Sequence, residues 1–355
     1  MDTLPVSLEL LAPSCDREEV LCTGSWNDWI TTTGVVRLKR KSPGYYVGKA
    51  QWPANGTRYK YFLGDWDHAE LDEWGTPAGD RHFVGQRQVR DAVPQFATGG
   101  KFYNPAFLPT VERLPPNLPI PEPFATRRIA ALLPHDYNGS GRRYPVLYLQ
   151  DGQNLFDEFA PYGNWEVDKR LAWLAERGMG DVIVLAIDHA EEKRISEFAP
   201  PTPNRVGQGV ADGYAEFLVK HLKPLIDRTY RTLPDRSNTA VGGSSMGALA
   251  SLYVAMTRPA VFGRAMLLSP SIWVDQDLAE DWQEHDYGPT RVWLYGGMDE
   301  TPGSAATFGI LAEQLRRRNT SRRPIYLDTY FNPAGKHTES AWGATFPRAV
   351  TSLFR

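Results

Sequence analysis

From residue 127 onward, short apolar runs alternate with stretches whose apolar residues recur every three or four positions. Seven of the runs have the length and composition of buried strands, namely residues 129–133, 144–150, 182–187, 239–241, 265–268, 292–295 and 325–330. One intervening stretch carries an apolar stripe at helical spacing, formed by Tyr214, Phe217, Leu218, Leu222 and Ile226. Because strands without a polar face must be covered on both sides, this alternation predicts an α/β fold with a doubly wound, mostly parallel sheet.

The first 107 residues follow a different pattern, in which polar and apolar positions alternate over short runs separated by Gly and Pro. Five of the 11 Trp residues fall before residue 80. Such runs are typical of strands that bury one face, so residues 1–107 are predicted to form an all-β, immunoglobulin-like sandwich. The proline-rich segment 108–123 is predicted to be an extended linker or wrapped arm, because proline fixes φ and removes a donor. Residues 124–355 form the second predicted domain.

Two adjacent serines lie in the segment VGGSSMGALAS, residues 241–251. Only Ser245 has a glycine two positions before it and two positions after it, at Gly243 and Gly247. A Gly-x-Ser-x-Gly frame between a strand and a helix forms a sharp turn that projects the serine Oγ above the sheet. An apolar run precedes this frame and a helical pattern follows it, so we expect Ser245 to be a nucleophile.

A serine nucleophile needs a histidine to accept its proton and a carboxylate to orient that histidine. Only His285 and His337 follow Ser245 in the chain. His337 comes after the last predicted strand, at the edge where parallel sheets bind ligands, so we expect it to be the base. The segment WLYGGMDE offers Asp299 as the acid at another strand end, with the adjacent Glu300 as the alternative.

The negative charge that develops on a substrate oxygen during attack by serine is stabilised by two backbone N–H donors. One donor is expected to be Met246, the residue after the nucleophile. The other is expected to be Gln153, which follows Asp151-Gly152 at the end of the predicted strand 144–150. The side chain of Asp151 is expected either to cap this turn or to bind hydroxyl groups of a substrate.

The charge of the chain narrows its range of partners. Lys and Arg number 39 against 42 Asp and Glu, which gives a net charge of −3 and argues against a nucleic-acid or anionic-membrane surface. The two cysteines, Cys15 and Cys22, do not form a disulfide framework or a zinc pattern and are expected to be packing residues. The first residues lack a basic start followed by an apolar block, so we expect a cytoplasmic protein.

Five segments of the second domain are similar, in sequence and in order, to the esterase D and enterochelin-esterase-like branch of the α/β-hydrolases, a branch that also resembles the mycolyltransferases. They are PVLYLQDGQNLFDE (145–158), GGSSMGALAS (242–251), LLSPSIW (267–273), YGGMDE (295–300) and GKHTESAW (335–342). The resemblance implies a serine esterase with Ser245, Asp299 and His337 as its triad. It also implies Gln153 and Met246 as the oxyanion donors.

The same resemblance implies that an acyl-enzyme on Ser245 is hydrolysed by water without a metal or cofactor. Substrates of this branch range over siderophore, feruloyl, thiol and simple carboxylic esters, so the implied partner is a small ester, with sugar- and aromatic-linked esters among the candidates. Two alternatives stay open at this point. One is an acyltransferase with the same triad and a sugar acceptor, and the other is a carbohydrate-binding scaffold whose hydrolase domain is inert.

The N-terminal domain resembles the starch- and glycogen-binding modules of the E-set type. The matching pieces are TGSWNDW (23–29), GTRYKYFLGDWDHAE (56–70) and GDRHF (79–83). Such modules stack sugar rings on exposed tryptophans, although a sandwich core also needs buried aromatic side chains. We expect this domain either to bind glucan or to cover the active site, and we expect Trp66, Trp74 and Arg81 to contact the substrate in the second case.

Overall fold

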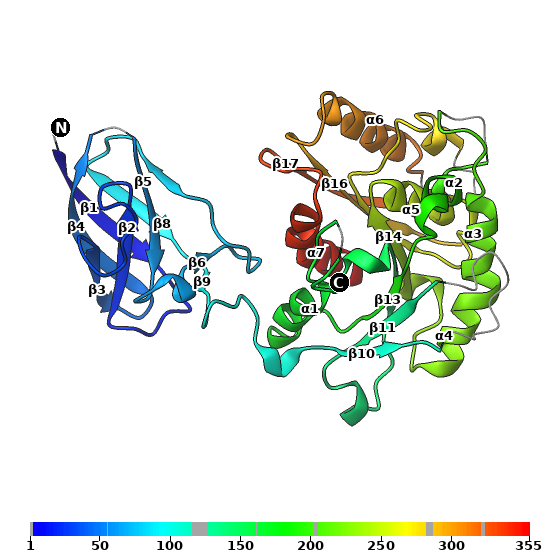
Figure 1. Cartoon of the computed structure of the whole chain (residues 1–355), viewed down its shortest axis with the longest axis horizontal. Helices are drawn as coiled ribbons and strands as arrows, with labels where there is room; N and C mark the ends of the chain where they lie inside the picture. Colours follow the sequence, from blue (N-terminus) through cyan, green and yellow to red (C-terminus); the bar gives the residue numbers. More distant parts are fainter. Residues whose placement is uncertain are drawn as a thin grey trace. The chain divides into compact units, whose positions relative to one another are not determined.

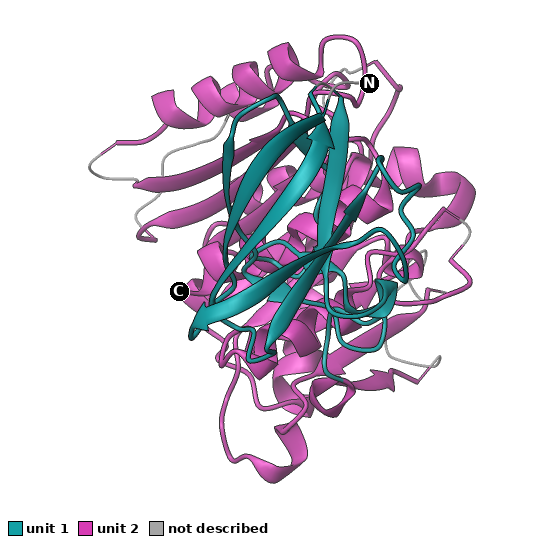
Figure 2. Ribbon diagram, turned by 90° about the vertical axis from the view of Figure 1, so that its left-hand side faces the viewer, with its two compact units in different colours: residues 1–104 teal, residues 105–355 magenta. Residues whose placement is uncertain are grey.

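The computed structural model describes residues 3–54, 56–115, 127–160, 162–201, 205–281, 287–320 and 324–355. The chain divides into two compact units, Met1–Asn104 and Pro105–Arg355, which Figure 2 shows in two colours. The division lies three residues before the predicted boundary at 107, and each unit has its own hydrophobic core.

Unit 1 is all-β, as its alternating pattern predicts. Its strands are β1 (Thr3–Leu11), β2 (Glu19–Gly24), β3 (Val36–Ser42), β4 (Tyr45–Pro53), β5 (Thr57–Phe62), β6 (Glu70–Leu71), β7 (Arg81–Phe83), β8 (Gln88–Ala92) and β9 (Gln95–Phe96), with a short 3₁₀ helix, η1, at Trp66–His68. Seven strands form one continuous sheet in the order β7-β5-β2-β3-β4-β1-β8, and β6 pairs with β9.

The seven-stranded sheet of unit 1 folds around a single core. Along β1, the side chains of Val6, Leu8 and Leu10 alternate with more exposed ones, as expected for a strand with one buried face. The core that they join includes buried residues from the other six strands and also both cysteines, Cys15 and Cys22. The prediction of packing cysteines is therefore confirmed, whereas the immunoglobulin-like class of the sandwich stays a prediction.

Unit 2 contains an eight-stranded sheet in the order β10-β11-β13-β12-β14-β15-β16-β17. Its strands are β10 (Thr110–Arg113), β11 (Ile129–Leu133), β12 (Val146–Gln150), β13 (Ile183–Ile187), β14 (Thr239–Ser244), β15 (Arg264–Leu268), β16 (Thr290–Gly297) and β17 (Ile325–Asn332). The strands from β12 to β17 are parallel, and β10 and β11 add an antiparallel edge. All seven predicted strands are present, and the sheet is mostly parallel as predicted.

The eighth strand corrects the prediction of a linker over residues 108–123. Thr110–Arg113 pairs in antiparallel register with Ala130–Leu133, so the start of the proline-rich segment is the edge strand β10. All four residues of β10 are exposed, and for this reason its sequence carries no apolar pattern. Apart from Pro115, the prolines in the rest of the segment lie in residues 116–126, which are outside the described residues.

Helices cover both faces of the sheet in unit 2 (Figure 1). They are α1 (Val167–Glu176), α2 (Arg194–Phe198), α3 (Ala211–Phe217), α4 (Lys223–Thr229), α5 (Met246–Thr257), α6 (Ser304–Arg317) and α7 (Glu339–Phe354). The predicted stripe from Tyr214 to Ile226 lies on α3 and α4, which a π-helical turn, Leu218–Leu222, joins. Helix α5 is buried along almost its whole length, so it packs on all sides rather than on one stripe.

The order of the strands determines where a site can form. From β12 the chain first continues to β13 on one side, and the next strand, β14, pairs with β12 on its other side. The loops that leave the carboxyl ends of β12 and β14 therefore diverge, and ligands of open α/β sheets bind at such a point. The predicted nucleophile Ser245 follows β14, and the predicted oxyanion turn follows β12.

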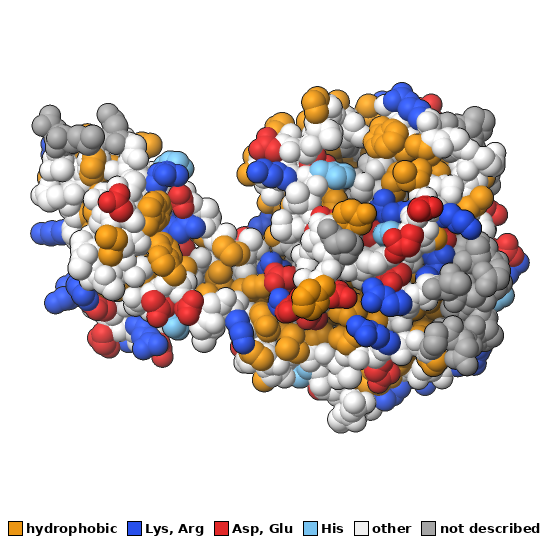
Figure 3. All heavy atoms as spheres, viewed as in Figure 1, with side chains coloured by type: hydrophobic (Ala, Val, Ile, Leu, Met, Phe, Trp, Pro, Cys, Tyr) orange, Lys and Arg blue, Asp and Glu red, His pale blue; other side chains and the backbone are white. Residues whose placement is uncertain are grey.

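The surface shows no large field of one sign on the face drawn in Figure 3, where basic and acidic side chains are interspersed. This distribution agrees with a net charge of −3. Within the described ranges, no helix combines the length and the hydropathy that crossing a bilayer requires.

Candidate active site

Ser245 occupies a strained turn between β14 and α5. Its backbone has φ 53° and ψ −121°, a conformation that is rare for a residue with a side chain. The Ser245 N–H donates to the carbonyl of Leu268 on the neighbouring strand at 2.9 Å, which ties the turn to the sheet. The turn therefore has the backbone geometry that projects a serine side chain above the strand ends.

The flanking glycines are required for steric reasons. A Cβ on Gly243 would lie 2.8 Å from the carbonyl carbon of Gly247. A Cβ on Gly247 would lie 2.7 Å from Oδ2 of Asp151 and 3.0 Å from the Cβ of Gln150. Because the end of β12 packs this closely against the turn, the Gly-x-Ser-x-Gly frame is a consequence of packing between β12 and β14.

His337 lies beside Ser245, as the sequence predicts. It precedes Thr338, the N-cap of α7, in the loop that follows β17. The distance between His337 Nε2 and Ser245 Oγ is 3.0 Å. When the imidazole carries its proton on Nδ1, Nε2 accepts the hydrogen bond from the Ser245 hydroxyl, which is the arrangement of a general base and its nucleophile.

The carboxylate beside His337 is Glu300, not Asp299, and this corrects the prediction. Glu300 Oε2 lies 3.2 Å from His337 Nδ1. Strand β16 continues to Gly297, two residues beyond the predicted strand end, so the turn begins later and Met298 and Asp299 are exposed. Glu300 is the residue that returns toward the sheet, and its side chain is only 7% exposed.

The second oxygen of Glu300 is held from the sheet side. Oε1 accepts hydrogen bonds from the Ser269 hydroxyl and from the Gly297 N–H, both at 2.6 Å. Trp342 of α7 donates its indole N–H to the Ser269 hydroxyl oxygen at 2.9 Å, and its ring packs edge-on against the His337 ring, with centroids 4.8 Å apart. Glu300 and His337 are thus contacted by the side chains of Ser269, directly after β15, and Trp342 of α7, and by the backbone N–H of Gly297 at the end of β16.

The predicted oxyanion donors occupy the expected strand ends. Met246 is the first residue of α5, where backbone N–H groups have no acceptor within the helix. Gln153 lies in the 3₁₀ turn Gly152–Asn154 after β12, and its side chain exchanges hydrogen bonds with the backbone of His189. The role of the two amides at an oxyanion stays a prediction.

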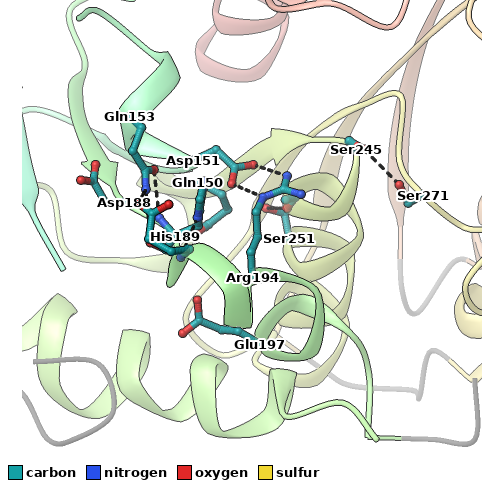
Figure 4. Close-up of polar contacts among 12 residues, drawn as sticks. Gln150, Asp151, Gln153, Asp188, His189, Arg194, Glu197, Ser245, Ser251 and Ser271 are labelled. Carbon is teal, nitrogen blue, oxygen red and sulfur yellow. Dashed lines mark hydrogen bonds and ion pairs between the residues drawn. The ribbon is translucent and has the colours of Figure 1, made fainter. Parts of the chain in front are cut away.

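Asp151, also predicted to act at this turn, is bound by Arg194 of α2. The Arg194 Nε and Nη2 atoms donate to its two carboxylate oxygens at 2.6 and 2.8 Å. Figure 4 draws this pair between Ser245 and the side chains of Gln153 and His189. The Asp151 side chain does not cap the turn, and its predicted binding of substrate hydroxyls stays a prediction.

A cleft of about 490 Å³ opens at Ser245 and His337. Apolar side chains contribute much of its wall, in particular those of Trp273, a residue that is 47% exposed, and Phe308. Its other lining residues are Met246, Ser269, Pro270, Ser271, Tyr295, Gly296, Glu300, Thr301, Pro302, Ser304 and Thr307. The space and its lining suit a small organic ligand.

Two ionisable groups close to the site have raised pKa values, which favour their neutral forms. Burial, reinforced by the negative charge of Glu300, raises the pKa of Tyr295 to about 12, so its phenol stays protonated at neutral pH. Burial also raises the pKa of Glu339, in the first turn of α7, and the nearby Asp151 carboxylate acts in the same direction. Within the described ranges, no group of three His, Cys, Asp or Glu side chains is placed to hold a metal ion.

Unit 1 contains the remaining predicted contacts, Trp66, Trp74 and Arg81. The Arg81 guanidinium pairs with Glu70 at 2.8 Å and with Asp91 at 3.0 Å, so its charge is neutralised inside the unit. Trp66 is 42% exposed, and the Trp74 indole donates to the adjacent Glu73. The predicted role of these three residues at the substrate stays a prediction.

Sequence reasoning missed the side chains of Ser269 and Ser271 and ranked Glu300 below its neighbour Asp299. The sequence offered Glu300 as the alternative to Asp299. The choice between them required the length of β16, which the sequence did not show. Ser269 and Ser271 lie in the segment LLSPSIW directly after an apolar run, so their position at a strand end was a usable signal. Nothing in the sequence showed that Ser271 Oγ would lie 3.2 Å from Ser245 Oγ.

The fold and the arrangement of Ser245, His337 and Glu300 define an α/β-hydrolase. Residues 124–353 match the model of the Esterase family, whose description is "Putative esterase". The matched region is more than half of the chain, and the chain therefore belongs to this esterase family.

Curated relatives are similar over part of this chain. An endo-1,4-beta-xylanase/feruloyl esterase of Xylanibacter ruminicola is 25% identical over 42% of this chain and 20% of its own length. A siderophore triacetylfusarinine C esterase of Aspergillus fumigatus is 27% identical over 44% of this chain and 58% of its own length. This chain thus spans between 20% and 58% of the length of the curated relatives that it matches first.

Solved structures with the same fold include an IroE-like serine hydrolase from Shewanella oneidensis, with a TM-score of 0.53 at 19% identity over 69% of this chain and 80% of that one. An enterobactin esterase from Shigella flexneri, solved in the presence of enterobactin, has a TM-score of 0.53 at 16% identity over 100% of this chain and 94% of that one. At these identities the likeness concerns the fold.

Proposed function

We propose that this protein is a serine carboxylic-ester hydrolase that acts through an acyl-enzyme on Ser245. The observation that carries the proposal is the continuous hydrogen-bonded chain from Ser245 Oγ to His337 Nε2 and from His337 Nδ1 to Glu300 Oε2, with distances of 3.0 and 3.2 Å. The membership of the esterase family supports the same reaction class.

In the first half of the reaction, Ser245 Oγ attacks the ester carbonyl carbon while its proton passes to His337 Nε2. Glu300 stabilises the imidazolium that forms, because its Oε2 faces the protonated Nδ1. The amides of Met246 and Gln153 donate to the oxyanion. The C–O bond to the alcohol then breaks, and the alcohol leaves with the proton that His337 had accepted.

In the second half, a water molecule loses a proton to His337 Nε2 and attacks the acyl carbon. The bond between that carbon and Ser245 Oγ breaks, and Ser245 regains its proton as the acid leaves. A sugar hydroxyl in the place of this water would make the protein an acyltransferase. Product analysis with and without an added sugar separates the two reactions, because only a transferase forms a new ester.

The cleft supports esters with one bulky or aromatic part. Its volume of about 490 Å³ exceeds what an acetyl group requires, and Trp273 offers a flat apolar surface beside Ser271. Relatives named for feruloyl and siderophore esters point to the same class. We therefore expect a higher kcat/KM for methyl ferulate or a catecholate ester than for ethyl acetate.

The test of the reaction compares two neighbouring serines. Ser245→Ala is expected to lower kcat for p-nitrophenyl acetate by about 10⁴- to 10⁶-fold and to abolish labelling by a fluorophosphonate. Ser244→Ala, the matched control one position earlier on β14, is expected to keep both. Wild-type turnover by Ser245→Ala would refute the mechanism, and an unlabelled wild-type protein would indicate an inert hydrolase domain.

A further inference from the structure

The turn Ser269-Pro270-Ser271, which follows β15, contacts both ends of the triad. Its backbone is fixed on two sides, because the Ser269 N–H donates to the Tyr295 carbonyl at 2.8 Å and the Ser271 N–H donates to the Ser245 carbonyl at 3.1 Å. Ser269 has φ 49°, in the left-handed region that favours glycine. Non-glycine residues held in this region cluster at functional sites.

The Ser269 hydroxyl has a fixed hydrogen-bond direction. Its oxygen accepts from the Trp342 indole N–H, a group that can only donate, so the hydroxyl proton is left for Glu300 Oε1 at 2.6 Å. Ser269 is 6% exposed, which limits the access of water that could replace it. Because the Gly297 N–H also donates to Oε1, the carboxylate is oriented with Oε2 toward His337.

The Ser271 hydroxyl meets the other end of the triad. Its oxygen lies 3.2 Å from Ser245 Oγ, as the dashed line in Figure 4 marks. The Ser245 proton is directed to His337 Nε2, so the lone pair of Ser245 Oγ is left to accept from Ser271. Such a bond holds the Ser245 side chain in one rotamer, with its hydroxyl directed to His337.

We propose that Ser269 is a positioning residue for the acid and that Ser271 is a hydrogen-bond donor to the nucleophile, so that one turn holds both ends of the triad. The inference rests on the proposed function. The two hydroxyls have separable effects, because Ser269 acts on the pairing of Glu300 with His337, whereas Ser271 acts on Ser245 alone.

The pH profile of kcat/KM distinguishes positioning from simple packing. Without the Ser269 hydroxyl, the Glu300 carboxylate turns more freely and stabilises the protonated imidazole less. The acid limb of the profile then moves to lower pH. Glu339 is a further titratable group whose charge acts on His337. Substitution of Ser269 or Ser271 leaves the Glu339 side chain in place.

The experiment compares Ser269→Gly and Ser271→Ala with the wild type on p-nitrophenyl acetate. Glycine tolerates the positive φ of Ser269, so this variant loses the hydroxyl without adding strain. For Ser269→Gly we expect kcat to fall about 10- to 100-fold, as for a lost bond to a charged group, and the acid limb to move by about 0.3 pH units or more. For Ser271→Ala we expect a fall of about 5- to 10-fold with an unchanged acid limb and KM.

Two further variants complete the test. Trp342→Phe keeps the aromatic ring against His337 but removes the indole donor, and it is expected to move the acid limb in the same direction as Ser269→Gly. Ser251→Ala, the matched control, removes a buried hydroxyl of α5 that bonds the Gly247 carbonyl, and it is expected to leave the profile unchanged. Thermal melts establish that each variant is folded.

The outcomes separate this inference from the proposed function. The inference would be overturned if the acid limb of Ser269→Gly were the same as in the wild type, or if kcat of Ser271→Ala stayed within twofold of the wild type. The proposed mechanism would still stand in either case, provided that Ser245→Ala is inactive. An active Ser245→Ala would overturn both.

Discussion

The exchange Glu300→Gln tests the acid more sharply than removal of the side chain would, because glutamine has nearly the same shape. The position of Glu300 Oε1 faces two donors, the Ser269 hydroxyl and the Gly297 N–H, so the amide oxygen of the glutamine must take that place. Its NH₂ group then faces His337 Nδ1. The imidazole must accept there and carry its proton on Nε2, where it can no longer accept the proton of Ser245.

The expected loss follows from the distance between the charges. Two unit charges 3.2 Å apart, as Oε2 and Nδ1 are, attract by about 5 kcal/mol at an effective dielectric constant of about 20. Each 1.36 kcal/mol corresponds to about tenfold in rate, so this attraction corresponds to about 10⁴-fold. Solvent reaches the His337 side chain, which is 36% exposed, and reduces the value. We therefore expect kcat to fall about 10³- to 10⁴-fold.

The matched control is Asp299→Asn. Asp299 is exposed, and its contact with Gly335 is made by its backbone N–H, which the substitution retains. We expect kcat within about twofold of the wild type. Steady-state kinetics on p-nitrophenyl acetate across pH 5–9 measures both variants, and raising the pH should not restore Glu300→Gln, because its defect is the tautomer. The reasoning is refuted if Glu300→Gln stays within tenfold of the wild type, or if Asp299→Asn loses as much.

Three further predictions concern stability and domain limits. Gly309→Ala, at an exposed position of α6 with open space around its Cα, should raise the free energy of unfolding by about 0.5–1 kcal/mol in urea melts, and a decrease would contradict the helix-propensity argument. Burial raises the pKa of Asp168, so the folded state holds its proton more tightly than the unfolded state and stability falls as the pH rises through this titration. The melting temperature of Asp168→Asn should therefore fall less than that of the wild type between pH 4 and pH 7. The same pH dependence of the melting temperature in both proteins would contradict this prediction. A fragment that starts at Pro105 should be monodisperse in size-exclusion chromatography. A fragment that starts at residue 124 lacks β10, so it exposes the edge of Ile129–Leu133 and should aggregate. If both fragments behaved alike, β10 would not be needed to cover this edge.

The sequence alone predicted most strands of unit 2, because β11, β12, β13 and β14 are buried at every residue, and β15 and β16 at all but one, so each appears as an apolar run. It also predicted that Ser245 and His337 lie side by side, and the structure places Oγ and Nε2 3.0 Å apart. The glycine frame is a local steric requirement of the turn at Ser245, and His337 was one of only two histidines that follow it. These features depend on neighbours in the chain or on chain order, both of which a sequence contains.

The choice between Asp299 and Glu300 required the tertiary structure. Hydrogen bonds to β17 extend β16 as far as Gly297, so a partner distant in sequence sets the residue at which the turn begins. Strand β10 was hidden for the same kind of reason, because its four exposed residues are ordered by backbone pairing to β11 and not by burial.

Ser269 and Ser271 required the tertiary structure as well. Their partners, Glu300 and Ser245, lie 31 and 26 positions away in the chain. A serine that follows a strand has the same local pattern whether its hydroxyl meets water or a catalytic group. Only the packing of β15 between β14 and β16 brings these two hydroxyls to opposite ends of the hydrogen-bonded chain Ser245–His337–Glu300, because distances between strands depend on the order of the sheet and not on the order of the chain.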